Sequence, residues 1–177
     1  DIRELKVGDM VLLSGKLFTG RDAIHKYLHE GNPSPVSLQD QIIYHCGPVV
    51  LEENNGYRVV AAGPTTSIRE EPYQWEVMRD HGILGVIGKG GMGVKTLEGC
   101  KKYGCVYFHA IGGAAQVLAE KIKSVDNVYL KEKFGSPEAI WELSVEDFPV
   151  VVTMDSHGHS LHEEVQKVSQ ANLEKLL

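Results

Sequence analysis

The chain has 177 residues, of which 42% are hydrophobic and 24% are charged. This length is typical of one domain that buries roughly 70% of its unfolded surface, so we expect a single domain over residues 1–177 that folds alone. The formal net charge of −6 argues against a broad nucleic-acid surface, which needs a basic face. No apolar run approaches the ~20 residues that span a bilayer, so we expect a soluble protein without a membrane segment.

The cysteines indicate a reducing compartment. Cys46, Cys100 and Cys105 are odd in number and too few for a disulfide framework. We find no secretory or transit segment, although the chain begins at Asp1 without a methionine. We therefore expect a cytoplasmic protein.

The first part of the chain predicts strands around one helix. Residues 7–18 indicate two short strands broken at Ser14 and Gly15. A helical pattern follows to Gly31, with Thr19 or Asp22 as its cap, so that Arg21 lies at the helix entrance. After a polar loop at 31–41, residues 46–63 indicate two strands joined by a turn at Asn55 and Gly56.

The second part alternates strands and helices before ending in strands. Pro72 and Gly82 bracket a helix, and a second helix ends near Tyr103. Strands are predicted at 83–88, 105–111, 127–134, 139–145 and 149–155, with a helix at 112–123 and a final helix or tail at 160–177. Because the alternation is confined to the middle, we predict an α/β fold with a mixed sheet and flanking helices rather than a regular doubly wound fold.

Three polar, glycine-rich loops each follow a predicted strand and carry a cation. They are residues 19–21 with Arg21, 65–69 with Arg69, and 89–91 with Lys89. Ligands often bind beyond strand ends, where loops and helix N-termini expose backbone N–H groups. On one rim, the three loops would form an anion site.

The middle loop, GPTTSIR at 63–69, is the most distinctive. It offers hydroxyls and, in Arg69, a planar fork that matches a carboxylate. An alternative of about equal weight is a capped turn in which Arg69 pairs with Glu70 or Glu71. Lys89 lies in GKGGMG, which lacks the order of a phosphate loop, so a carboxylate contact is favoured over a nucleotide.

The histidines and cysteines do not predict a metal site. His157, His159 and His162 follow Asp155 without an evident fourth ligand, so we predict a polar turn there. The cysteine spacing fits neither zinc nor a cluster, which indicates packed thiols. His25 is predicted on the helical face of Arg21, in a supporting role, and His109 as a hydrogen-bonded core residue.

Four segments resemble the iron–sulfur-dependent (class I) fumarases and L-tartrate dehydratases, in their C-terminal domain or separate beta subunit. The segments are SGKLFTGRDAIH (14–25), GPTTSIR (63–69), GVIGKGGMG (85–93) and VYFHAIGGAA (106–115). The resemblance implies a swivelling β/β/α domain that closes over a cluster-bearing alpha subunit. It also implies a dicarboxylate substrate, no cofactor on this chain, and a [4Fe–4S] cluster held by the partner's cysteines.

The same resemblance implies roles for individual residues. Arg21, Arg69 and Lys89 would contact substrate carboxylates together with Thr66, and Thr65 would lie where the proton is transferred. The supporting residues would be His25, Gly63 and Gly90. An alcohol is a poor base, so Thr65 would need activation, expected from the partner.

One position departs from the family pattern. Many members have methionine after the arginine of this loop, whereas this chain has Glu70. A carboxylate there would either weaken the grip of Arg69 or point to solvent. The leading hypothesis is a beta subunit for reversible hydration of fumarate to (S)-malate. The alternatives are an L(+)-tartrate dehydratase beta subunit and a non-catalytic organic-anion-binding module, and the sequence leaves a higher oligomer open.

Overall fold

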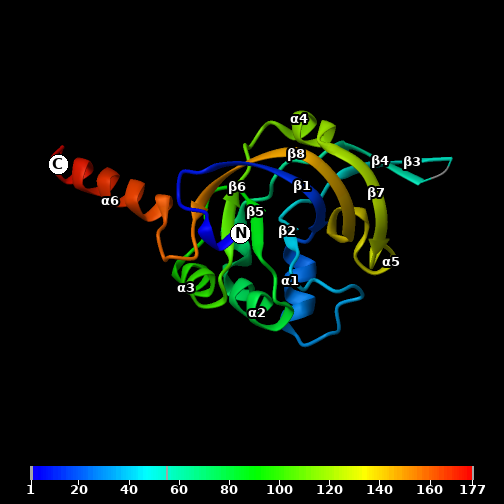
Figure 1. Ribbon diagram of the computed structural model, residues 1–177, viewed down its shortest axis with the longest axis horizontal. Coiled ribbons are helices and arrows are strands. Elements are labelled where there is room, and N and C mark those ends of the chain that lie inside the picture. The colour runs from blue at the N-terminus through cyan, green and yellow to red at the C-terminus, as the bar shows by residue number, and fades with distance from the viewer. Residues whose placement is uncertain (1, 55, 177) are drawn as a thin grey trace.

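The computed structural model describes residues 2–54 and 56–176 and has a curved mixed sheet with helices packed on it (Figure 1). The parallel strands are β1 (Met10–Thr19), β2 (Ile42–Tyr44), β5 (Gly85–Gly88) and β6 (Val106–His109). The long β8 (Ile140–Met154) runs antiparallel to β1, β6 and β7 (Ile122–Tyr129). Because β8 pairs with both β1 and β6, these strands form a closed ring of pairings, and the predicted mixed sheet is confirmed.

Alternating residues of the parallel strands supply two hydrophobic clusters. Phe18, Ile43 and Val86 face the helices α1 (Asp22–His29), α2 (Glu71–His81) and α3 (Val94–Tyr103). Their neighbours Leu17, Tyr44 and Ile87 face a second cluster with Trp141 and Phe148 of β8 and Leu118 of α4 (Ala115–Glu120). A strand buried on both faces reads as a continuous apolar run. The strands β5 and β6 were predicted on this basis, whereas the three-residue β2 was missed.

The peripheral elements surround this core. Strands β3 (Val49–Glu53) and β4 (Gly56–Ala61) form the predicted hairpin; Asn55 of its turn lies outside the described residues. The short η1 (Ile2–Glu4), η2 (Ser67–Glu70), α5 (Lys131–Phe134) and η3 (Ser136–Glu138) lie in connections. At the C-terminal end, α6 (Leu161–Glu174) extends away from the body of the molecule (Figure 1). None of the described helices combines the length and apolarity needed to cross a bilayer.

Several predicted boundaries were wrong. The two strands predicted within 7–18 are one, β1 at Met10–Thr19, because the register shift between Leu13 and Gly15 bends this strand without ending it. The strands predicted at 139–145 and 149–155 are one, since Phe148 between them is fully buried. Residues 131–134 form a helical turn instead of a strand, and the helix predicted at 112–123 ends at Glu120.

The start of α1 also differs from the prediction. Thr19 does not cap this helix because its hydroxyl lies in the sheet, where it donates to Ala139 O at 3.1 Å and accepts from Trp141 N at 2.9 Å. Asp22 is the first helical residue, and Arg21 takes the cap position without a side-chain cap. The helical ends marked by Pro72 and Gly82 are confirmed, with Gly82 in the left-handed conformation at φ 60°.

Candidate active site

The carboxyl ends of the parallel strands meet at one rim, and the three cation-bearing loops leave from it. β1 ends just before Arg21, and β5 just before Lys89. The 63–69 segment joins this rim by backbone pairing: Thr65 N donates to His45 O at 2.6 Å and Ser67 N to Lys89 O at 3.0 Å. The structure therefore brings these loops side by side, as loops at neighbouring strand ends should be.

Lys89 and the threonines form the first part of the site. Lys89 Nζ donates to Thr66 Oγ1 at 2.8 Å, and no carboxylate pairs with Lys89 among residues 2–54 and 56–176. The Thr65 hydroxyl is half-buried and makes no hydrogen bond within the same ranges. Lys89 and Thr65 thus keep donor capacity for a ligand.

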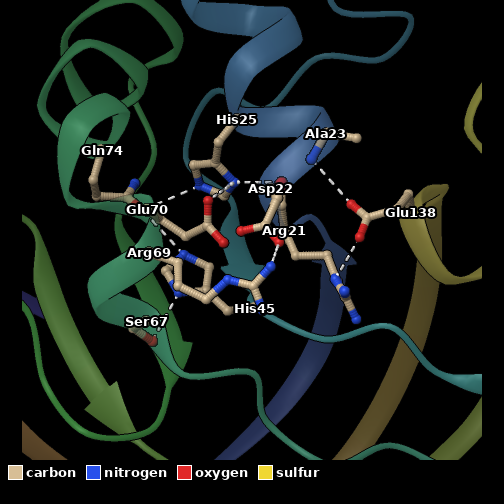
Figure 2. A network of polar contacts seen from close by, with 10 residues as sticks. All are labelled: Arg21, Asp22, Ala23, His25, His45, Ser67, Arg69, Glu70, Gln74 and Glu138. Carbon is tan, nitrogen blue, oxygen red and sulfur yellow. Dashed lines mark hydrogen bonds and ion pairs between the residues drawn. The ribbon is translucent and has the colours of Figure 1, made fainter.

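The two arginines each contact a carboxylate of this chain (Figure 2). Arg69, whose side chain is 54% exposed, donates to Asp22 at the start of α1. Arg21 Nε lies 2.6 Å from Glu138 Oε1 of η3, and Glu138 also accepts from Ala23 N at 3.0 Å. A Cβ at Gly47 would lie 2.6 Å from the backbone oxygen of Pro137 and 2.8 Å from Arg21 Nη1, so glycine is required there. Arg69 holds several unused donors toward solvent.

The alternative in which Arg69 pairs with Glu70 or Glu71 was wrong in its partners, because Arg69 pairs with Asp22 instead. Glu71 accepts from Gly93 N at 2.8 Å, Lys95 N at 3.0 Å and Thr96 Oγ1 at 2.6 Å. A carboxylate at these N–H groups satisfies the free donors at the start of α3. Glu71 therefore anchors the glycine-rich loop that carries Lys89.

Glu70 was predicted either to weaken Arg69 or to point to solvent, and the second option was wrong. Its side chain is fully buried, with Oε2 3.8 Å from His25 Nδ1. Burial is the main cause that raises the pKa of Glu70 to about 8, and Asp22 adds to the effect. Glu70 is therefore mainly protonated at neutral pH.

A buried hydrogen-bonded relay lies beneath the rim (Figure 2). The Oε1 position of Gln74 in α2 lies 3.1 Å from His25 Nε2 and 3.0 Å from His45 Nε2. His45 Nδ1 continues to Ser67 Oγ at 2.9 Å, and Ser67 Oγ accepts from the Tyr107 hydroxyl at 2.9 Å. The relay connects α1, α2 and the strands to the 63–69 loop, so it fixes the loop's backbone.

The relay histidines are neutral. Burial lowers the pKa of His25 to about 4, and burial followed by the His25 ring lowers the pKa of His45 well below its ordinary value. His25 Nδ1 lies 3.2 Å from the carbonyl oxygen of Arg21. Because a carbonyl only accepts, Nδ1 carries the proton and Nε2 is the acceptor. The Gln74 amide then turns its NH₂ toward both rings.

His25 is near Arg21 as predicted, but its full burial separates it from any ligand in solvent. The sequence analysis missed His45, Gln74, Asp22 and Glu138. His45 follows a buried strand directly, a signal that was present in the sequence. Gln74 and Glu138 are single polar residues without a motif, and only their tertiary contacts reveal them.

The glycines named as supporting residues have separate structural reasons. A Cβ at Gly63 would lie 3.2 Å from Ala115 Cβ of α4, so this position is tightly packed. Gly90 has φ +78°, which disfavours other residues after Lys89. Gly88 is more constrained, since a Cβ there would overlap Ser67 Oγ at 1.7 Å.

The remaining histidines and the cysteines confirm the predicted turn and packed thiols. Asp155 is buried and accepts from the backbone N–H groups of His157 at 2.9 Å and His159 at 3.0 Å. His109 was predicted to be hydrogen-bonded, but its buried Nδ1 has no partner in the described part of the chain. No group of metal-ligating side chains was found among the described residues.

The cysteines do not suit an iron–sulfur cluster. All three are fully buried, and burial raises the pKa of Cys46 and of Cys105 to about 12. Cluster ligands are thiolates, whereas these thiols stay protonated. The residues of this chain therefore do not fit a cluster.

With this geometry established, the family can be identified by comparison. The model of the fumarase C-terminus matches residues 1–165. This chain belongs to the fumarase C-terminus family. It is 61% identical, over 99% of its length and 33% of the relative's, to a Geobacillus stearothermophilus protein provisionally named fumarate hydratase class I.

Two further relatives of this chain carry subunit names. The Methanocaldococcus jannaschii protein provisionally named L(+)-tartrate dehydratase subunit beta is 43% identical, over 100% of this chain and 93% of its own length. The L(+)-tartrate dehydratase subunit beta of Escherichia coli K12 is 36% identical, over 95% of this chain and 84% of its own. The chain thus spans a third of the first relative and most of each subunit.

Proposed function

We propose that this chain is the beta subunit of a two-subunit hydro-lyase that hydrates fumarate reversibly to (S)-malate. The observation that supports this most is that a member of the fumarase C-terminus family places four residues on one rim: Arg21, Arg69, Lys89 and Thr65. The alignment with most of each named beta subunit supports a separate subunit, and the 61% identity to the fumarate hydratase relative favours fumarate.

In this proposal the arginines and Lys89 bind the substrate carboxylates. Arg69 presents its guanidinium to solvent while one donor holds Asp22, and Lys89 Nζ lies on Thr66 without a carboxylate partner among the described residues. Charge-assisted hydrogen bonds contribute about 1.5 to 3 kcal/mol each. Fixed cations also stabilise the negative charge that develops on the carboxylate beside the reacting carbon.

Thr65 is proposed to move the proton on carbon. Thr65 is half-buried, and its hydroxyl makes no hydrogen bond in the described ranges. Its carbonyl oxygen accepts from Lys89 N at 3.3 Å, which places Thr65 next to Lys89. Since an alcohol barely ionises at neutral pH, we assign its activation to the alpha subunit. We place the [4Fe–4S] cluster on that subunit too, where it would supply the Lewis acid for the leaving hydroxyl.

Alanine variants of the cations test the assignment in the reconstituted complex. Arg69→Ala or Lys89→Ala should lower kcat/KM about 100-fold or more, because each removes a charge-assisted contact that strengthens in the transition state. Arg58→Ala is the matched control for Arg69, since Arg58 is also exposed and pairs with Glu53. Near-wild-type kcat/KM in either site variant would refute the assignment.

The runner-up function is L(+)-tartrate dehydration, favoured by the match over 93% and 84% of the length of the two beta subunits of that name. Steady-state assays of the complex with fumarate and L(+)-tartrate decide between them by kcat/KM. A non-catalytic anion-binding module would instead bind dicarboxylates as the chain alone and form no stable alpha complex, which calorimetry and pull-down detect. The swivelling motion, the cytoplasmic location and a higher oligomer stay predictions.

A further inference from the structure

Glu70 occupies an unusual position for a carboxyl group. Its side chain is fully buried, and neither carboxyl oxygen accepts a hydrogen bond from the described residues. An ionised carboxylate without donors would be strongly destabilised there. A protonated carboxyl, in contrast, needs only an acceptor for its O–H. The geometry therefore requires a nearby acceptor.

The acceptor that lies beside Glu70 is the Asp22 carboxylate. Asp22 starts α1 and faces Glu70, and a hydrogen bond between the two side chains is among the causes that raise the pKa of Glu70. Figure 2 shows the Glu70 carboxyl between the His25 ring and the Asp22 carboxylate. Asp22 accepts from Arg69 as well. A protonated Glu70 beside Asp22 would therefore place its O–H on the same carboxylate that accepts from Arg69.

We propose that Glu70 and Asp22 act as one carboxyl pair that positions Arg69 and allows it to exchange Asp22 for a substrate carboxylate. The inference rests on the proposed function, because it takes Arg69 as a substrate-binding residue. Glu70 is a positioning residue in this account, since it acts through Asp22 and does not touch the substrate.

The charges around the pair explain the exchange. With Glu70 protonated, Asp22 neutralises Arg69 and Glu138 neutralises Arg21. When a dicarboxylate takes Arg69, Asp22 loses its cation, and an ionised Glu70 would then leave two adjacent negative charges. The Glu70 proton keeps the pair singly charged. Arg69 is therefore released at lower cost when Glu70 is protonated.

Among the described residues, the charged and titratable groups that act on Glu70 come from α1, η2 and η3. From α1 the facing groups are Asp22 and His25, and burial lowers the pKa of His25 to about 4. Arg69 lies beside Glu70 in η2, and Glu138 acts from η3. The field of Arg69 lowers the pKa of Glu70, so its departure to the substrate raises that pKa further. Substrate binding above this pKa therefore takes up a proton.

The pair is tested first in the isolated chain. A ¹³C carboxyl titration by NMR should show one glutamate with a pKa of about 8, and the Arg69 guanidinium ¹⁵N shift should follow the same curve. Glu70→Gln keeps a donor toward Asp22 and should abolish both titrations. The control Glu98→Gln, at an exposed glutamate of α3, should keep them. A Glu70 that titrates near 4.5 would overturn the inference.

The effect on substrate is tested in the reconstituted complex. The ratio of the wild-type KM for fumarate to the KM of Glu70→Gln should rise about tenfold between pH 7 and pH 9, because the ionised pair retains Arg69. A flat ratio would overturn the exchange. If the complex turns over neither acid, the proposed function fails, and the coupled titration of Glu70 and Arg69 in the isolated chain still decides whether the pair exists.

Discussion

Replacing Gln74 with leucine should destabilise the fold and disturb the rim together. Gln74 is fully buried and bridges His25 Nε2 at 3.1 Å and His45 Nε2 at 3.0 Å. Leucine fills a similar volume but leaves both ring nitrogens unpaired. An unsatisfied buried polar group costs about 1 to 3 kcal/mol, so two of them should lower the free energy of unfolding by about 2 to 6 kcal/mol. The loop held through Ser67 should then lose its restraint.

Urea unfolding followed by circular dichroism measures the loss of stability. Gln166→Leu is the matched control, because Gln166 is exposed on α6 and its replacement should change the free energy of unfolding by less than about 0.5 kcal/mol. In the complex, Gln74→Leu should also lower kcat/KM at a temperature where it stays folded. A Gln74→Leu variant as stable as the wild type would refute the hydrogen-bonded relay.

The remaining predictions concern stability and chemical reactivity. Glu70→Gln should stabilise the chain by about 3 to 5 kcal/mol at pH 8. The raised pKa of Glu70 means that the wild type loses stability as the pH rises from 4.5 to about 8, whereas the variant does not. Equal urea denaturation midpoints of wild type and variant near pH 8 would contradict this. Glu71→Ala should cost about 1 to 3 kcal/mol in urea unfolding because the first turn of α3 loses its carboxylate; an unchanged midpoint would exclude this cap. The buried thiols of Cys46, Cys100 and Cys105 should react with a disulfide reagent at pH 8 only after unfolding, and rapid native labelling would disprove their packing.

The parts of the site that follow strand ends could be predicted from the sequence. The predicted strand at 83–88 is a continuous apolar run that leads directly into Lys89 and two glycines, and the strand segment that ends at Phe18 leads into Gly20 and Arg21. Strand direction then dictates that these loops share a rim. Arg21, Arg69 and Lys89 were found in this way, without knowledge of their contacts.

The contacts that tune these residues could not be predicted. Asp22 and Glu138 are ordinary surface-type residues in sequence, and their pairing with the arginines depends on how α1 and η3 approach the rim. The burial of Glu70 has the same origin, since it depends on α1 covering η2. Likewise, the union of two predicted strands into β8 depends on the burial of Phe148. These contacts are set by long-range packing, which local sequence patterns do not predict.

The most direct test of the account is fumarate hydration by the chain alone and after anaerobic mixing with a cluster-bearing alpha subunit. We predict that the isolated chain does not turn over fumarate, and that mixing restores turnover, which reaches a maximum at a fixed subunit ratio. The mixed complex that carries Arg69→Ala should lose this turnover. Robust hydration by the isolated, metal-free chain would contradict the proposal that this rim is half of an active site.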